Sequence, residues 1–156
     1  MDMYNLLSAI KTAIADDADV KAWTQDVYKK DHMVFLGTDR RQEPDEDKYP
    51  LVGIFPVSKE CGYDATIYAH EIDVVCGVHD DDMVDTGVSN LIEYAGIERI
   101  EIFRKKVENA IASTNIEGII TMLRIAYEAI EFFPFFLAGM TIRISEYVSL
   151  GDDAFK

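Results

Sequence analysis

Cysteine is scarce in this chain, which contains only Cys61 and Cys76 among its 156 residues. Two cysteines cannot build the disulfide framework that stabilises many small secreted domains. Cys76 falls inside a strand-like pattern, so we expect a buried thiol there. The first residues lack a basic segment followed by an apolar one, and we therefore expect no signal peptide and a soluble protein in a reducing compartment.

Basic residues and long apolar runs are also in short supply. The chain has 15 Lys and Arg against 29 Asp and Glu, which gives a net charge of −14 at pH 7. Nucleic-acid phosphates and anionic membranes repel such a chain, so we expect neither as a direct partner. The longest apolar stretch, 132–142, contains Pro134 and Gly139 and is too short to cross a bilayer.

Motifs of catalysis and phosphate binding are absent as well. The sequence contains no Walker A run, no GxGxxG and no GxSxG. His70 and Cys76 lie on one predicted strand, where their spacing puts them about 20 Å apart, beyond hydrogen-bond reach. We therefore expect no catalytic residue and no cofactor, and we interpret the protein as a non-enzyme.

The overall composition is that of one folded domain. Hydrophobic residues make up 49% of the chain and charged residues 28%. The length suffices for one sizeable core. We expect a single domain over 1–156, with a mobile polar loop at 38–48 and a polar tail at 151–156.

Two segments have the apolar spacing of amphipathic helices. In 3–15 and 91–112 the apolar residues recur every three or four positions. Asp2 and Asn90 are suited to cap the two N-termini. Together with the strand-like segments, they predict an α+β fold in which two helices pack on one face of an antiparallel or mixed sheet.

Strand-like patterns fill most of the remaining sequence. Segments 49–57 and 65–79 are expected to form a hairpin, and Pro56 predicts that the first strand lies at a sheet edge or ends there. Segment 119–131 fits both a strand and a helix, and we favour the strand. The other strand-like segments are 20–28, 33–36 and 135–149.

One acidic cluster has residues of the kind that bind metal ions. Asp80, Asp82 and Asp85 follow His79, and hard cations require several converging carboxylates. The EF-hand spacing is missing, and acidic residues ahead of a helix also suit the helix dipole. We therefore predict no resident metal and keep the three aspartates as weak candidates for an assembly-linked cation.

Charged residues in two loops are the candidate subunit contacts. Arg40 and Arg41 lie in the polar loop beside acidic neighbours, and they pair either with these neighbours or with a partner subunit. Asp81 and Asp82 lie in the acidic connector after strand 65–79. Copies of such an acidic chain repel one another unless basic residues lie opposite acidic ones, or cations screen the charge.

In the order of its segments and in the pattern of its strands, the chain resembles the tail terminator proteins of long-tailed bacteriophages, of the lambda minor tail protein U type. The resemblance covers most of the chain. It runs from the N-terminal helix through the Trp23 region and the polar loop to the hairpin of Tyr49–Phe55 and Thr66–Val78. A helix follows, and Pro134–Glu146 closes the sheet.

The resemblance implies an α+β subunit, from a phage or prophage, that forms a hexameric ring and has no catalytic residues. Such a ring caps the tail tube, ends its polymerisation and offers a surface for joining the head. The implied partners are further copies of the chain, the tail tube protein and a head-completion or connector protein. The implied locations are the host cytoplasm during assembly and then the virion tail.

Two alternatives remain open at this point. One is an adaptor, of the neck or tail-completion kind, that binds one protein by strand addition at the edge strand 49–57. The other is a small enzyme or metal-binding protein that uses a divalent metal held by His79 and Asp80 to Asp82. Oligomeric state separates both from the ring.

Overall fold

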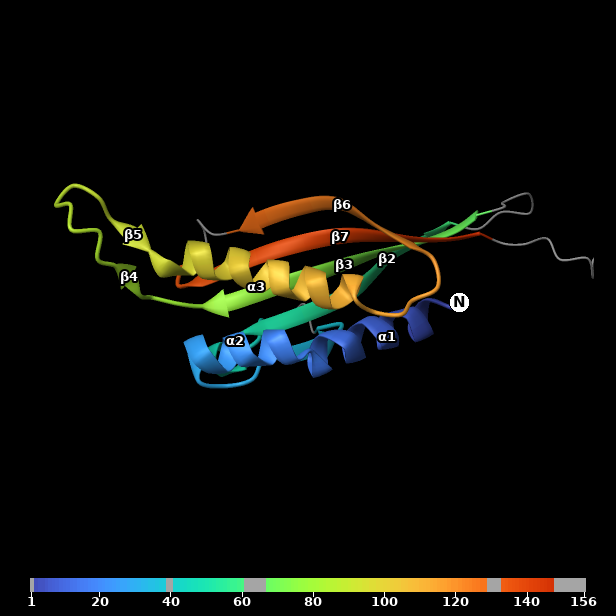
Figure 1. The fold of residues 1–156 in the computed structure, drawn as a ribbon, viewed down its shortest axis with the longest axis horizontal. Helices are drawn as coiled ribbons and strands as arrows, with labels where there is room; N and C mark the ends of the chain where they lie inside the picture. The colour runs from blue at the N-terminus through green and yellow to red at the C-terminus, as the bar shows by residue number, and fades with distance from the viewer. Residues whose placement is uncertain (1, 39–40, 61–66, 129–132, 148–156) are drawn as a thin grey trace, which may run out of the picture.

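A mixed sheet forms one layer of the protein. The computed structural model describes residues 2–38, 41–60, 67–128 and 133–147. In these ranges the sheet has five strands, which are β1 (Met33–Leu36), β2 (Leu51–Glu60), β3 (Ile67–His79), β6 (Ile119–Glu128) and β7 (Phe135–Tyr147). They lie in the order β1-β2-β3-β7-β6, with β1 parallel to β2 and the other neighbours antiparallel (Figure 1).

The helices lie together on one face of this sheet. They are α1 (Met3–Asp16), α2 (Ala18–Tyr28) and α3 (Ala95–Ala112), and Figure 1 shows them along the same side of the strands. Asp2 caps α1 as predicted, because its carboxylate accepts a hydrogen bond from the Asn5 backbone amide at 2.9 Å. The α+β fold is confirmed, with α2 as an additional helix. No helix in the described ranges is long and apolar enough to span a membrane.

The strand predicted at 20–28 is wrong, because this segment belongs to α2. Asp17 caps the helix by accepting a hydrogen bond from the Val20 amide at 2.8 Å. Val20 and Thr24, four positions apart, are fully buried, and the Trp23 ring stacks on Phe103 at 5.6 Å. The fully buried positions are four apart, which is the spacing of a helix face, and the alternation did not follow burial, since Ala22 between them is exposed.

The predicted helix 91–112 begins later than expected, at Ala95, and Asn90 does not cap it. Its N-cap is Tyr94, which makes no side-chain cap hydrogen bond. The backbone before it is extended as β5 (Glu93–Tyr94) and pairs with β4 (Met83–Val84). Pairing with β4 keeps this stretch extended, and a helix can start only after it.

The edge position predicted for strand 49–57 is wrong, since β2 lies between β1 and β3 and continues to Glu60. The parallel partner β1 is short, however, and pairs only with Leu51 to Ile54. Pro56 lies beyond that reach, and a register shift follows between Pro56 and Ser58. The outer strands of the sheet are β1 and β6, and the strand favoured for 119–131 is confirmed over Ile119–Glu128.

The core lies between the sheet and the three helices. Cys76 is among its fully buried members, as predicted, and burial raises the pKa of its thiol to about 12. Other members come from every layer, including Leu6, Ile10, Val20, Val52, Ile72, Val74, Phe103, Val107, Phe136, Met140, Ile142 and Ile144. Residues 61 and 148–156, which include Cys61 and the predicted tail, lie outside the described ranges.

Native Cys76 is expected to resist thiol reagents. In a Cys61→Ser background at mildly alkaline pH, labelling requires an opening of the core and should be at least about 10³-fold slower than in denaturant. Mass spectrometry of the labelled protein over time measures the rate. A native rate close to that of the unfolded chain would contradict the burial of this thiol.

Candidate assembly surface

The acidic connector leaves the main sheet at a buried carboxylate, Asp80. This side chain is 2% exposed, and the Arg99 guanidinium donates to it at 2.6 Å. The Tyr28 hydroxyl donates to the same oxygen at 3.0 Å. Arg99 also donates to Asp82 at 2.6 Å, and so joins α3 to both ends of the turn. Burial and the Asp80 charge raise the pKa of Tyr28, while hydrogen bonds to Asp80 and Asp82 raise the pKa of Arg99.

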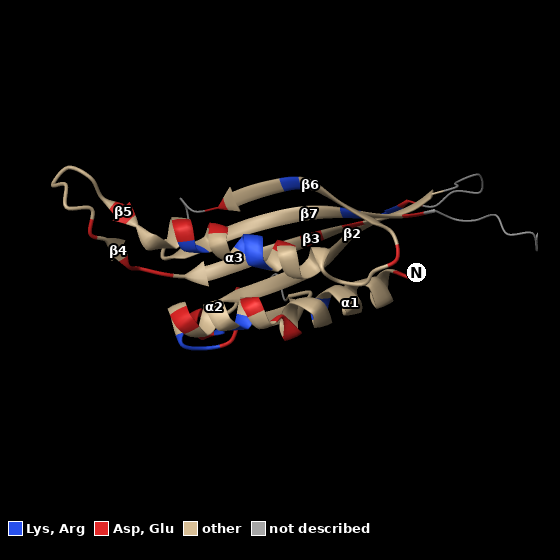
Figure 2. Cartoon of the chain, viewed as in Figure 1, with Lys and Arg blue, Asp and Glu red and all other residues tan. Residues whose placement is uncertain are grey.

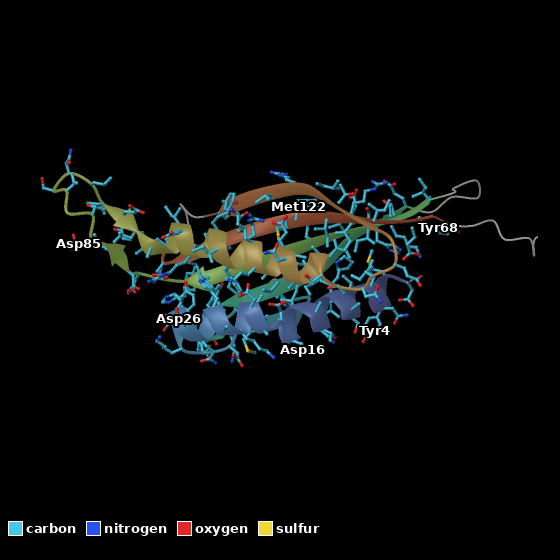
Figure 3. All side chains as sticks on the ribbon, viewed as in Figure 1. Tyr4, Asp16, Asp26, Tyr68, Asp85 and Met122 are labelled. Carbon is cyan, nitrogen blue, oxygen red and sulfur yellow. The ribbon has the colours of Figure 1, made fainter. Side chains whose placement is uncertain are left out.

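The three candidate metal ligands, Asp80, Asp82 and Asp85, already have partners within the protein. Arg99 already supplies positive charge between Asp80 and Asp82. Asp85 instead accepts a hydrogen bond from the Gly87 amide at 3.0 Å, and Figure 3 places it away from the sheet. Within the described ranges, no three side chains of His, Cys, Asp or Glu gather as a metal site would require.

The connector continues as a projecting hairpin, which we call the arm and define as residues 80–94. It contains β4 and β5 and extends beyond the end of the main sheet (Figure 1). A hairpin this small is marginal alone, and the anchors at Asp80 and Asp82 fix its base. The Ala95 amide adds to these anchors by donating to the Asp82 carbonyl at 3.0 Å.

The arm is both apolar and acidic. Ile92 is 68% exposed and Met83 60%, although such side chains are normally covered in a folded domain. The arm contains no Lys or Arg, and Figure 2 shows only acidic charge along it. Its other exposed apolar side chains are Val84, Val88, Leu91 and Tyr94.

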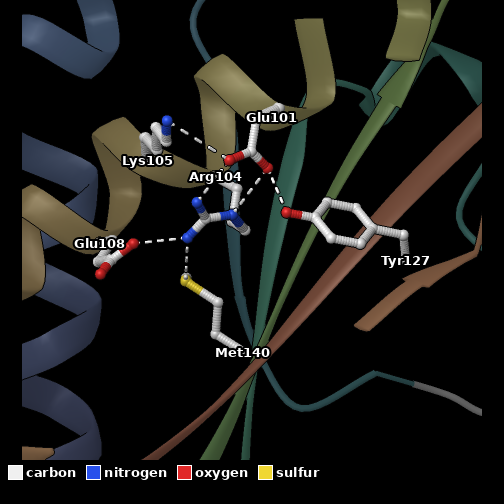
Figure 4. A network of polar contacts seen from close by, with 6 residues as sticks. All are labelled: Glu101, Arg104, Lys105, Glu108, Tyr127 and Met140. Atoms are coloured by element: carbon white, nitrogen blue, oxygen red, sulfur yellow. Dashed lines mark hydrogen bonds and ion pairs between the residues drawn. The ribbon is translucent and has the colours of Figure 1, made fainter. Parts of the chain in front are cut away.

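A polar network ties the outer strand β6 to α3 (Figure 4). Arg104 is buried and donates to Glu101 at 2.8 and 3.1 Å and to Glu108 at 2.5 Å. The Tyr127 hydroxyl of β6 donates to the same Glu101 carboxylate. Hydrogen bonds from Arg104, and then from Tyr127, lower the pKa of Glu101 to about 2.

Apolar surface lies beside this network. We call it the α3–β6 seam and define it as Ile97, Ile100 and Glu101 of α3 with Ile125 and Tyr127 of β6. Most of these residues line a surface hollow of about 340 Å³. Ile97 is 59% exposed and Tyr127 51%. In the described ranges β6 pairs only with β7, so its other edge offers unpaired backbone groups.

The predicted contact residues are scattered over the molecule. Asp81 is exposed and Asp82 is held by Arg99, both within the arm. Arg41 is exposed ahead of the short helix η1 (Glu46–Lys48), on another part of the chain. Arg40 lies outside the described residues, so its place stays a prediction.

Sequence reasoning missed the apolar residues of the arm and of the seam. Ile92 was assigned to a helix face and Ile125 to a general strand pattern, and neither assignment distinguished exposed from buried positions. The available signal was Met83-Val84 between aspartates, followed by Leu91-Ile92. Apolar side chains gathered in such a polar segment can form an exposed apolar patch, which marks an interaction site.

The chain matches no family model, and no curated protein matches it.

Proposed function

We propose that this chain is a structural subunit of the phage or prophage tail terminator kind, which assembles into a ring and works through its surfaces. The observation that carries the proposal is the presence of two unlike exposed apolar surfaces, the arm and the α3–β6 seam. A ring needs two different complementary patches on every subunit, whereas a twofold dimer needs only one. In the proposed role the ring closes the tail tube and offers a surface for the head.

The acidic charge sets the conditions for such assembly. A ring of six copies has six times the net charge of −14, so unscreened subunits repel one another. Salt and Mg²⁺ shorten the range of this repulsion, since the Debye length falls to about 10 Å at 0.1 M ionic strength. Assembly should therefore be stronger at moderate salt than at very low salt.

An adaptor that binds one partner by strand addition is the second candidate. The observation in its favour is the edge of β6, which no strand of the described residues covers. It replaces 49–57 as the candidate edge, because β2 is paired on both sides over Leu51–Ile54. The metal-binding alternative loses support because Arg99 lies between Asp80 and Asp82.

Solution mass tests the ring. Light scattering across protein concentration, with and without Mg²⁺, is expected to show a species of six times the chain mass of 17.6 kDa. Its population should rise with concentration and with screening of the charge. A monomer under every condition would contradict self-assembly in solution and favour the adaptor.

A further inference from the structure

We propose that the arm of one copy docks on the α3–β6 seam of a neighbouring copy. The inference deepens the proposed ring function, and rests on it, by naming the contact that joins successive subunits. The occupant is a second copy of this chain, and its docking element is residues 80–94.

The two surfaces are matched in kind. The arm presents large apolar side chains, of which Ile92 is the most exposed. The seam offers a hollow between Ile97 and Tyr127 that such side chains can fill, and the edge of β6 beside it has no strand partner within the described residues. An extended segment of the arm can also add backbone hydrogen bonds along that edge.

Charge favours this pairing over the alternatives. The arm has acidic residues only, among them Asp81, Asp85 and Glu93. On the seam side Lys105 of α3 is 65% exposed and lies 3.7 Å from Glu101. Arg124 adds a second positive charge on β6 itself, on the sheet face opposite to Ile125, because it pairs with Thr141 whereas Ile125 pairs with the buried Met140. Arm against arm places acid beside acid, so two copies are not expected to pair through their arms.

The arm cannot dock on the seam of its own copy. Its base is held by Asp80 to Tyr28 and Arg99, and from there it projects past the end of the sheet instead of returning along β6 (Figure 1). The apolar residues of the arm and of the seam are thus left for different molecules. A contact of this type is head to tail, as a closed ring requires.

Two surface variants and their mixture test the docking. Ile92→Asp disables the arm and Ile125→Glu disables the seam, and each is expected to weaken self-association at least about 30-fold. Tyr4→Asp is the matched control, because Tyr4 is 67% exposed on α1, apart from both surfaces (Figure 3), and it should assemble as the wild type does. Circular dichroism and thermal unfolding confirm that each variant is folded.

The mixture gives the sharper result. Each variant keeps the surface that the other has lost, so equal amounts should form a heterodimer and stop there. The variants alone should remain monomers. Association by Ile125→Glu alone, or a mixture that remains monomeric while the wild type assembles, would overturn the docking.

Cross-linking separates failure of the docking from failure of the ring. In a Cys61→Ser background, copies with Ile92→Cys are mixed with copies with Ile125→Cys under mild oxidation at high concentration. The mixed disulfide is expected to exceed both like-with-like products, even if the wild type forms no ring in dilute solution. If the mixed product does not exceed that with a Tyr4→Cys partner, the docking is wrong, whatever mass light scattering gives.

Discussion

Replacing Gly96 with alanine is expected to destabilise the protein by about 2 kcal/mol, although alanine is the better helix former. A Cβ at this position would lie 2.2 Å from Cε2 of Phe136 and 2.3 Å from Cδ2. Phe136 is 2% exposed in the core and cannot move aside freely. The gain in helix propensity is at most about 1 kcal/mol, so the steric cost of about 1–3 kcal/mol decides the sign.

The same substitution is expected to loosen the base of the arm. The Phe136 ring packs edge-on against Phe133 at 6.2 Å, and Phe133 packs against Tyr94 at 5.0 Å. Displacement of Phe136 therefore reaches the last residue of the arm. Urea unfolding measures the loss, with Glu98→Ala, at an exposed site on the same helix, as the control within about 0.5 kcal/mol of wild type.

A double-mutant cycle that combines Gly96→Ala with Phe136→Leu tests whether the clash with Phe136 causes the loss of stability. If the clash is responsible, Gly96→Ala should cost less in the Phe136→Leu background, with a coupling energy of about 1 kcal/mol. A Gly96→Ala protein that is more stable than wild type would show that the helix and β7 are less tightly packed than the structure indicates.

Much of the fold could be predicted because its signals are local. Asp2 ahead of an apolar stripe marks the start of α1, and strict alternation from Ile72 to Val78 marks a strand with one buried face. The α2 segment was misread because only Val20 and Thr24 are fully buried there, too few to establish a helical period. The late start of α3 depends on pairing between β4 and β5, which no local rule predicts.

The candidate surface was harder to predict than the fold. The sequence contains the aspartates of the arm, but their partners Arg99 and Tyr28 come from two helices that only the tertiary fold brings together. The acidic cluster was kept only as a weak candidate for a cation site, and in the structure Asp80 and Asp82 pair with the Arg99 guanidinium. The exposed edge of β6 could not be predicted from the sequence either, because the alternation of apolar residues does not say which strand is outermost in the sheet.

Replacing Arg104 with methionine is expected to lower the free energy of unfolding by about 2–4 kcal/mol near neutral pH. The guanidinium side chain is 4% exposed and neutralises Glu101 and Glu108 at once. Methionine fills similar volume beside Met140 but leaves both carboxylates without this partner. These carboxylates are 35% and 38% exposed and can rehydrate in part, which keeps the loss below that of a fully buried pair.

Lys105→Met is the matched control for this prediction. Lys105 contacts the same Glu101 carboxylate at 3.7 Å, but it is 65% exposed, so its removal should cost less than about 0.5 kcal/mol. Urea unfolding of both variants compares a buried with an exposed partner of one carboxylate. Equal losses would contradict the central place of Arg104 in the network.

The pH dependence of stability gives Arg104→Met a second readout. Because the pKa of Glu101 falls from its ordinary 4.5 to about 2 in the folded protein, the unfolded chain binds this proton first as the solution is acidified. The stabilisation is complete above about pH 4.5 and is lost as pH falls towards 2, by about 1–2 kcal/mol after allowance for the exposure of Glu101. Arg104→Met should lose this part of the acid dependence, while Lys105→Met should keep it. In Arg104→Met, amide exchange should also rise along β6, since Tyr127 would then bind a carboxylate that has lost its buried partner and keeps only the exposed Lys105.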